Sequence, residues 1–192
     1  MKRTKKLMTL LALLLVFSLS LVACGGGAKG PLESVVKSYF EAVSAGDFDK
    51  ISEFIDGSEG SAMPATDVEG LKAVLGEENL DALFKAVGDV KIIDPVESIE
   101  GDKGTLKAKF EGKTLKSIIE NYMNATMEYS TSPEAINMDL EALNAKMLDI
   151  FSDTVAKTEK TTTEGEIQFV KVGDTWKLAK ENPFLEKMLS GE

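Results

Sequence analysis

Apolar residues change their spacing at Gly88-Asp89, and this change is the strongest constraint on the fold. Before it, apolar side chains recur every three or four residues, as on one face of an α-helix. The first such stripe consists of Leu32, Val35, Val36, Tyr39, Phe40 and Val43. After it, residues 90–99 are rich in Val and Ile, and residues 105–110 alternate between polar and apolar, as strands do. Helices followed by strands predict an α+β fold.

A second helical region lies between two predicted β-hairpins. Residues 90–99 and 105–110 predict the first hairpin, and residues 160–172 and 175–179 predict the second. Between them, residues 114–158 carry two stripes of helical spacing, which predict a helical hairpin. We therefore expect N-terminal helices packed on a curved antiparallel sheet built from two β-hairpins, with a helical-hairpin insertion between them.

Local signals predict where several elements begin or end. Gly46 should end the first helix, and Asp47 should cap the next. Asp67 is expected to cap a third helix, and Ser132-Pro133 to begin the second helix of the insertion. Pro95 has no N–H for the strand ladder, so it predicts that its strand is interrupted or lies at a sheet edge.

The first 23 residues have the pattern of a secretory signal. The basic start Met1–Lys6 is followed by an apolar run from Leu7 to Val22. A helix of that run would be roughly 24 Å long, short of the ~30 Å hydrocarbon core of a bilayer. We therefore expect a leader that directs export and is then removed.

The apolar run ends in a sequence that resembles the lipobox of bacterial lipoproteins, Leu21-Val22-Ala23-Cys24. The resemblance implies diacylglycerol on the Cys24 sulfur, cleavage between Ala23 and Cys24, and often a further acyl chain such as palmitate on the new amine. Two or three acyl chains anchor a protein stably, where one chain is marginal. Cys24 is the only cysteine, so it cannot pair within its own chain. The alternative is an ordinary signal peptide or an uncleaved anchor with an incidental cysteine.

These features predict three segments of the chain. Residues 1–23 would be the cleaved lipoprotein signal peptide, and residues 24–31 the lipidated cysteine with a flexible Gly-rich tether. Such a tether reaches roughly 13 Å by square-root scaling. Residues 32–192 would be one folded domain, held close to the outer, extracytoplasmic face of the cell membrane.

The mature chain is strongly acidic. The whole sequence has 22 basic and 32 acidic residues, for a net charge of −10, and residues 1–23 hold four of the basic ones and no acidic one. The mature part therefore carries about −14, which repels phosphate backbones and anionic lipid headgroups. We expect no nucleic-acid partner, and we expect the membrane to be reached through the lipid alone.

The sequence contains no histidine, which removes the commonest general base and zinc ligand. Without it, the usual Ser-His and Cys-His nucleophile pairs cannot form. Neither a nucleophile elbow nor a calcium-binding loop is evident. We therefore predict no catalytic residues, no metal site and no cofactor.

Two stretches resemble the cystatin-like roll shared by ketosteroid isomerase and nuclear transport factor two relatives. Residues 35–43 followed by Gly46-Asp47-Phe48 resemble its opening helices. Residues 172–178 resemble its closing hairpin, where a tryptophan follows a Gly-Asp turn. The resemblance implies a curved sheet that wraps the first helix, with a pocket between them. The predicted helical insertion is absent from the simplest members, so the strand order stays open.

The same resemblance suggests residues that could line such a pocket, namely Tyr39, Phe110, Tyr122 and Trp176. In enzymes of this class a carboxylate and hydrogen-bond donors line the pocket. Tyr39, Tyr122 and Trp176 lie on apolar stripes, which favours the interpretation that they pack in the core.

Methionines in the predicted helical insertion have two interpretations: Met123, Met127, Met138 and Met147. Methionine surfaces can bind partners adaptably, but at helical spacing methionine more often fills gaps in a core. We favour the gap-filling interpretation.

Three functions fit these features. We favour a non-catalytic, membrane-tethered binding or accessory module of the cell envelope, whose partner is an envelope protein or a small ligand. The first alternative is an isomerase-like roll enzyme that uses a pocket carboxylate and a tyrosine. The second is a purely structural envelope lipoprotein.

Overall fold

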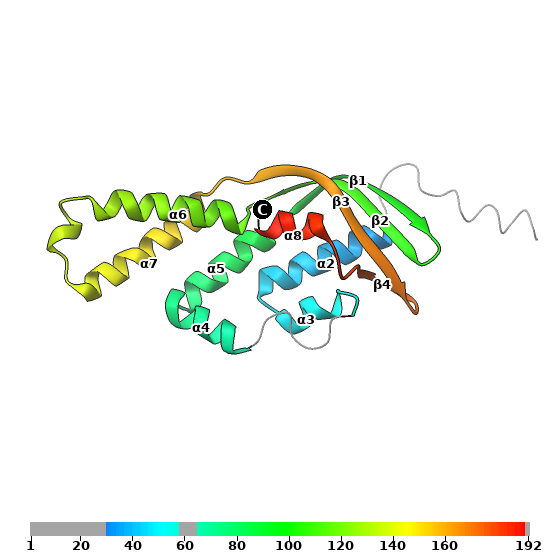
Figure 1. Ribbon diagram of the computed structural model, residues 1–192, viewed down its shortest axis with the longest axis horizontal. Helices are drawn as coiled ribbons and strands as arrows, with labels where there is room; N and C mark the ends of the chain where they lie inside the picture. Colours follow the sequence, from blue (N-terminus) through cyan, green and yellow to red (C-terminus); the bar gives the residue numbers. More distant parts are fainter. Residues whose placement is uncertain (1–29, 58–64, 191–192) are drawn as a thin grey trace, which may run out of the picture.

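The computed structural model describes residues 30–57 and 65–190, in which helices pack against a four-stranded antiparallel sheet (Figure 1). The strands follow chain order across the sheet: β1 (Lys91–Glu100), β2 (Lys103–Gly112), β3 (Thr161–Val172) and β4 (Thr175–Leu178). β1-β2 and β3-β4 form the two predicted hairpins, and a helical hairpin lies between β2 and β3 in the chain. The predicted α+β architecture is confirmed.

The helices before the sheet are α2 (Pro31–Ala45), α3 (Phe48–Glu53), α4 (Ala65–Leu75) and α5 (Glu77–Gly88). α2 ends at Gly46, whose φ of 65° is left-handed and suits glycine. The Asp47 side chain then caps α3 by accepting a 3.0 Å hydrogen bond from the Lys50 N–H. Both predicted helix boundaries are confirmed here.

The cap predicted at Asp67 is wrong. The α4 helix begins at Ala65, so Asp67 lies inside its first turn. Aspartate is favoured in the first turn of a helix as well as before it, because both positions interact with the helix dipole. An aspartate alone therefore cannot define the first residue of a helix.

The main core lies between α2 and the sheet, which curves over the helix (Figure 1). It contains the residues of the first predicted stripe and the inward face of the strands: Leu32, Val36, Tyr39, Phe40, Val43, Leu106, Phe110, Ile167, Phe169 and Leu178. Each fully buried Leu, Ile or Phe contributes roughly 1.5–3 kcal/mol. Gly104 allows the close approach of α2, since a Cβ there would lie 2.9 Å from Leu32 Cδ1.

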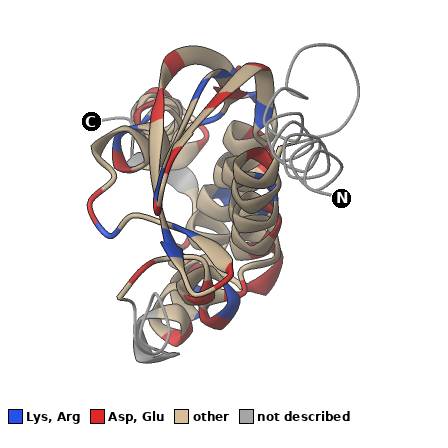
Figure 2. Ribbon diagram, turned by 90° about the vertical axis from the view of Figure 1, so that its right-hand side faces the viewer, with Lys and Arg blue, Asp and Glu red and all other residues tan. Residues whose placement is uncertain are grey.

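β1 is an edge strand with an irregularity, as Pro95 predicts. Its pairing with β2 shifts register between Ile93 and Val96, and Asp94 there has a positive φ of 52°. On the outer face, Lys107 and Lys109 of β2 pair with acidic neighbours at 3.5 and 3.8 Å. Basic residues of β2 therefore lie beside acidic residues of the neighbouring strands, and both charge types are seen on the sheet in Figure 2.

The C-terminal helix α8 (Pro183–Ser190) packs against β3. Asn182 joins the two elements, because its Nδ2 donates to the Gln168 carbonyl at 2.8 Å and its Oδ1 accepts from the Gln168 N–H at 3.2 Å. Leu185 and Met188 are buried in the main core. This packing closes one end of the space beneath the sheet.

The helical insertion consists of α6 (Leu115–Ser130), a short 3-10 turn (Ala135–Asn137) and α7 (Leu140–Lys157). In Figure 1 the two helices run side by side and extend away from the sheet. The start predicted for the second helix at Ser132-Pro133 is wrong. Ser132 instead accepts a 3.3 Å hydrogen bond from the Ala135 N–H, and Asp139 caps α7 by accepting from the Ala142 N–H at 2.8 Å.

Candidate functional site

The predicted lipidation site lies outside the described residues. Ala23, Cys24 and most of the tether precede Gly30, where the description of the chain begins. At the start of α2, the Glu33 N–H donates a 2.7 Å hydrogen bond to the Glu97 carboxylate of β1. This bond satisfies one of the free N–H groups of the helix end and joins α2 to the sheet edge. The point where the chain enters the domain is therefore held in place.

The four residues suggested as pocket-lining belong to two separate clusters. Tyr39 and Phe110 are buried in the main core, and Trp176 is half-buried against it. Tyr122 belongs instead to a second cluster with Ile118, Phe151 and Val155, beneath the helical hairpin. Its ring meets Phe151 edge-to-face at 5.3 Å between centroids. The structure therefore does not bring the four side chains together around one pocket.

Burial determines the chemistry of Tyr39. Its side chain is 5% exposed, and desolvation raises the pKa of the phenol from 10.0 to about 12. Burial disfavours the phenolate because the charged form loses its hydration. Tyr39 is therefore a neutral core residue at physiological pH.

A small, partly open cavity lies below the sheet, between the end of α5, the strands and α8. Its volume is about 10 Å³, and Phe110 is the one suggested pocket residue in its wall. The other lining residues include Val87, Val90, Lys113, Thr163, Met188 and Leu189. A cavity of this size holds about one water molecule.

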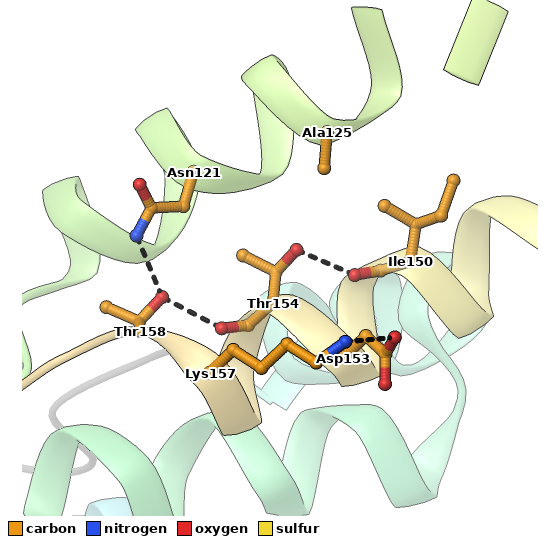
Figure 3. A pocket seen from close by; sticks show the side chains of 7 residues that line it. All are labelled: Asn121, Ala125, Ile150, Asp153, Thr154, Lys157 and Thr158. Carbon is orange, nitrogen blue, oxygen red and sulfur yellow. Dashed lines mark hydrogen bonds and ion pairs between the residues drawn. The ribbon is translucent and has the colours of Figure 1, made fainter. Parts of the chain in front are cut away.

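A larger cleft of about 260 Å³ opens between α6 and α7 (Figure 3). It is lined by Asn121 and Ala125 from α6 and by Ile150, Asp153, Thr154, Lys157 and Thr158 from α7 and the residue after it. A cleft of this size can accept a small polar molecule. None of the four residues suggested from the sequence lies in its wall.

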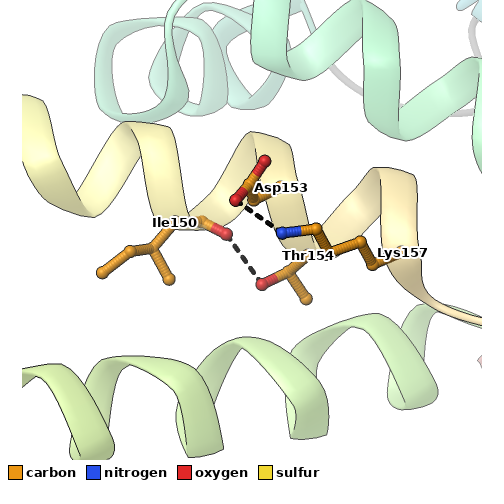
Figure 4. A network of polar contacts seen from close by, with 4 residues as sticks. All are labelled: Ile150, Asp153, Thr154 and Lys157. Atoms are coloured by element: carbon orange, nitrogen blue, oxygen red, sulfur yellow. Dashed lines mark hydrogen bonds and ion pairs between the residues drawn. The ribbon is translucent and has the colours of Figure 1, made fainter.

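Hydrogen bonds inside the cleft connect the two helices. Asn121 Nδ2 donates to Thr158 Oγ1 at 3.1 Å, and that hydroxyl donates to the Thr154 carbonyl at 2.8 Å. Thr154 donates in turn to the Ile150 carbonyl at 2.7 Å (Figures 3 and 4). Each hydroxyl proton is thus already used in a bond to a backbone carbonyl. The network stabilises the end of α7 and its contact with α6.

An ion pair lies at the rim of the cleft. Lys157 Nζ is 2.9 Å from Asp153 Oδ2, one helical turn away (Figure 4). The hydrogen bond and the charge of Lys157 lower the pKa of the Asp153 carboxyl. Asp153 is therefore ionised at neutral pH and acts as an acceptor in this arrangement.

The helix α6 carries two apolar stripes on different faces. Ile118 and Tyr122 face the second cluster. A further set lies outside it and is exposed: Leu115 (39%), Ile119 (45%), Met123 (58%) and Met127 (66%). We call these four residues the α6 ridge.

The α6 ridge corrects two expectations. Leu115, Ile119 and Met123 fall in the apolar pattern predicted for this helix, yet they do not share the buried face of Ile118. The gap-filling interpretation of Met123 and Met127 is wrong, because both are exposed. The sequence does contain one sign of a second apolar stripe. Leu115, Ile119, Met123 and Met127 recur every four residues, next to the stripe of Ile118 and Tyr122.

Apolar residues are exposed at the far end of the insertion too. Ile136 and Leu140, which fall within the region of helical apolar spacing, are 77% and 73% exposed. They lie where the chain turns from α6 to α7, beyond the reach of the second cluster. Exposed apolar side chains therefore extend along α6 and into the turn between α6 and α7.

Within residues 30–57 and 65–190, no three His, Cys, Asp or Glu side chains are placed so as to hold a metal ion. No helix within the same ranges combines the length and the hydropathy that crossing a bilayer requires.

Comparison with known proteins places the chain in no family. No protein-family model matches it, and neither does any curated protein. Among solved structures, it is similar to the crystal structure of a "putative lipoprotein" (ycdA) from Bacillus subtilis subsp. subtilis str. 168, with 13% identity and a TM-score of 0.43. The match covers 83% of this chain and 58% of the other. A likeness this distant assigns neither family nor function.

Proposed function

We propose that this chain is an extracytoplasmic lipoprotein, anchored to a cell membrane by lipid on Cys24. The single observation that carries the proposal is the sequence Leu21-Val22-Ala23-Cys24, at the end of a basic-then-apolar leader and with the only cysteine of the chain at its last position. Residues 24–31 would tether the domain within roughly 13 Å of the bilayer.

We further propose that residues 32–192 form a cystatin-like roll. The sheet curves over α2, and the Gly46-Asp47 boundary and the β3-β4 hairpin have the form that the family resemblance implies (Figure 1). The helical insertion between β2 and β3 distinguishes this chain from the simplest members. Strand order nevertheless follows the chain, β1-β2-β3-β4.

The roll is proposed to act as a non-catalytic binding or accessory module of the envelope. The space where an isomerase-like site would lie is occupied by Tyr39, Phe110 and Leu178, all at most 5% exposed. This packing gives the enzymatic alternative no support. The features that could contact a partner lie instead on the insertion, where the cleft and the α6 ridge are exposed.

Metabolic labelling with a fatty-acid analogue tests the anchor. We expect label on the native protein, and we expect Cys24→Ser to abolish it and to retain the leader, because the acceptor sulfur is lost. Gly26→Ala, two residues beyond the same site, is the matched control and should be labelled and processed normally. An unlabelled native protein, or label that persists in Cys24→Ser, would contradict the proposal.

A further inference from the structure

The α6 ridge is an apolar surface that no described residue covers. Its exposed fractions rise along the helix, from 39% at Leu115 to 66% at Met127. Two other apolar side chains of α6, Ile118 and Tyr122, pack in the second cluster instead. Surface apolar residues are unremarkable singly, but a contiguous row of them marks an interaction site.

The spacing of the ridge indicates what shape of partner fits it. The four residues recur every four positions, so they form one continuous ridge of the kind that packs into a groove on another helix. The ridge spans about 18 Å at 1.5 Å per residue, or about three helical turns. The hairpin extends away from the sheet (Figure 1).

The charge around the ridge indicates the chemistry of the partner. Between Leu115 and Leu140 the chain has four acidic residues, Glu120, Glu128, Glu134 and Asp139, all exposed, and a single basic residue, Lys116. An acidic margin attracts a cationic partner and repels an anionic one. A second copy of this acidic chain and an anionic lipid surface are both disfavoured for that reason.

The side chains of the ridge suit adaptable recognition. Half of them are methionine, which is unbranched and polarisable and can fit irregular apolar surfaces. Met123 and Met127 are also the two most exposed residues of the ridge. A partner helix would therefore bury these two side chains most completely.

From the spacing, the exposure and the charge together, we propose that the α6 ridge is a docking site for a cationic amphipathic helix of a partner protein. The helix places its apolar face on Ile119, Met123 and Met127 and its basic residues beside Glu120 and Glu128. This inference deepens the proposed binding function. It rests on that function only because the lipid anchor places the partner on the extracytoplasmic side of the membrane.

The experiment uses the full-length lipidated protein in phosphatidylcholine vesicles. The probe is a fluorescent Leu/Lys peptide of about 18 residues with helical amphipathic spacing, roughly 27 Å long. Anisotropy measures its binding, and protein-free vesicles provide the blank. A peptide of the same composition with strictly alternating Leu and Lys is the control for helical spacing. We expect the helical peptide to bind, and to bind more weakly as salt is added.

Variants then locate the binding site. Met123→Ser with Met127→Ser should weaken binding about tenfold or more, because the central apolar contacts are removed. Val74→Ser with Val172→Ser removes two apolar residues that are 73% and 47% exposed elsewhere, and should leave binding unchanged. Glu120→Gln with Glu128→Gln should weaken binding several-fold at low salt, while Glu53→Gln with Glu69→Gln should not.

Three results would overturn the inference. The first is equal binding by the ridge variant and native protein, or no binding by either. The second is a native protein whose ridge instead contacts the vesicles, shown by lipid quenching of a fluorophore at Met127→Cys. The third is self-association of the native protein that the ridge variant abolishes. None of these results bears on lipid attachment to Cys24, so the proposed anchor is tested separately.

Discussion

At the scale of single residues, close packing depends on positions where a side chain is absent. Gly165 of β3 lies directly under the ring of Phe184 in α8, and a Cβ at this glycine would overlap that ring. Phe184 also contacts Phe110 at 5.3 Å between ring centroids. The aromatic ring therefore has little space in which to move away.

Gly165→Ala should lower the free energy of unfolding by about 1–3 kcal/mol, because it overpacks the α8–β3 contact. Gly70→Ala is the matched control, since a Cβ at Gly70 has nothing within 4 Å and the residue lies inside α4. That change should raise stability by about 0.5–1 kcal/mol through helix propensity. Chemical denaturation measures both, and an undiminished stability of Gly165→Ala would show that α8 is not packed as described.

Tyr39 makes stability depend on pH in the alkaline range. Burial raises its pKa to about 12 in the folded chain, against 10.0 in the unfolded one. Below pH 10 both states are neutral at this residue; above it the unfolded state ionises first, and stability falls until about pH 12. The loss attributable to Tyr39 should be about 2–3 kcal/mol.

Tyr39→Phe isolates this effect from the titration of lysines, which both proteins share. The difference in unfolding free energy between native protein and variant should be constant below pH 10 and should shift in favour of the variant between pH 10 and 12. Urea unfolding at a series of pH values measures it. If the unfolding free energies of the native protein and the variant run parallel over the whole pH range, the phenol of Tyr39 is solvated in the folded state.

At the scale of elements, local chemistry predicted some boundaries and missed others. Gly46 and Asp47 act within a few residues of chain, so their roles were readable from the sequence. Ser132-Pro133 offered an equally good start for α7, but Asp139 supplies the cap that the folded chain uses. Choosing between two local signals depends on where the helix finds packing partners, and single-sequence patterns do not contain that information.

One lysine helps to hold the first and last residues of the helical hairpin together. Lys113, just after β2, donates from Nζ to the carbonyls of Val155 and Ala156 at 2.7 and 3.1 Å. These carbonyls belong to the last turn of α7, where backbone acceptors lack helical partners. A cation is also favoured at a helix C-terminus by the dipole.

Lys113→Met should destabilise the protein by about 1–2 kcal/mol and loosen the end of α7. Exposed Lys116, three residues on, provides the control, and Lys116→Met should change stability by less than about 0.5 kcal/mol. Amide hydrogen exchange of residues 154–158 reports the local effect. Equal protection in the two variants would refute the role assigned to Lys113.

At the scale of the whole molecule, the order of hydrophobic periods was enough to predict the α+β class and the placement of two hairpins around a helical insertion. Period determines element type, and chain order limits how the elements can meet. The sequence predicted less about the candidate site, which is the exposed face of α6. Tyr122 shares an apolar pattern with Met123, but one faces a cluster and the other faces outward, because only one side of α6 has neighbours.

The folded core and the helical insertion have different proposed roles. The sheet and α2 enclose the main core, while the insertion presents exposed apolar residues along α6 and at its turn. In the proposed account, lipid on Cys24 keeps the protein at the membrane and the insertion contacts a partner. Both roles require the proposed chemical state of the N-terminus.

Mass spectrometry of the N-terminal peptide from protein purified from its native membrane tests that state most directly. We predict a mature chain that begins at Cys24, with the mass of a diacylglycerol group on its sulfur. A peptide that begins upstream of Cys24, or an unmodified thiol at this position, would contradict it.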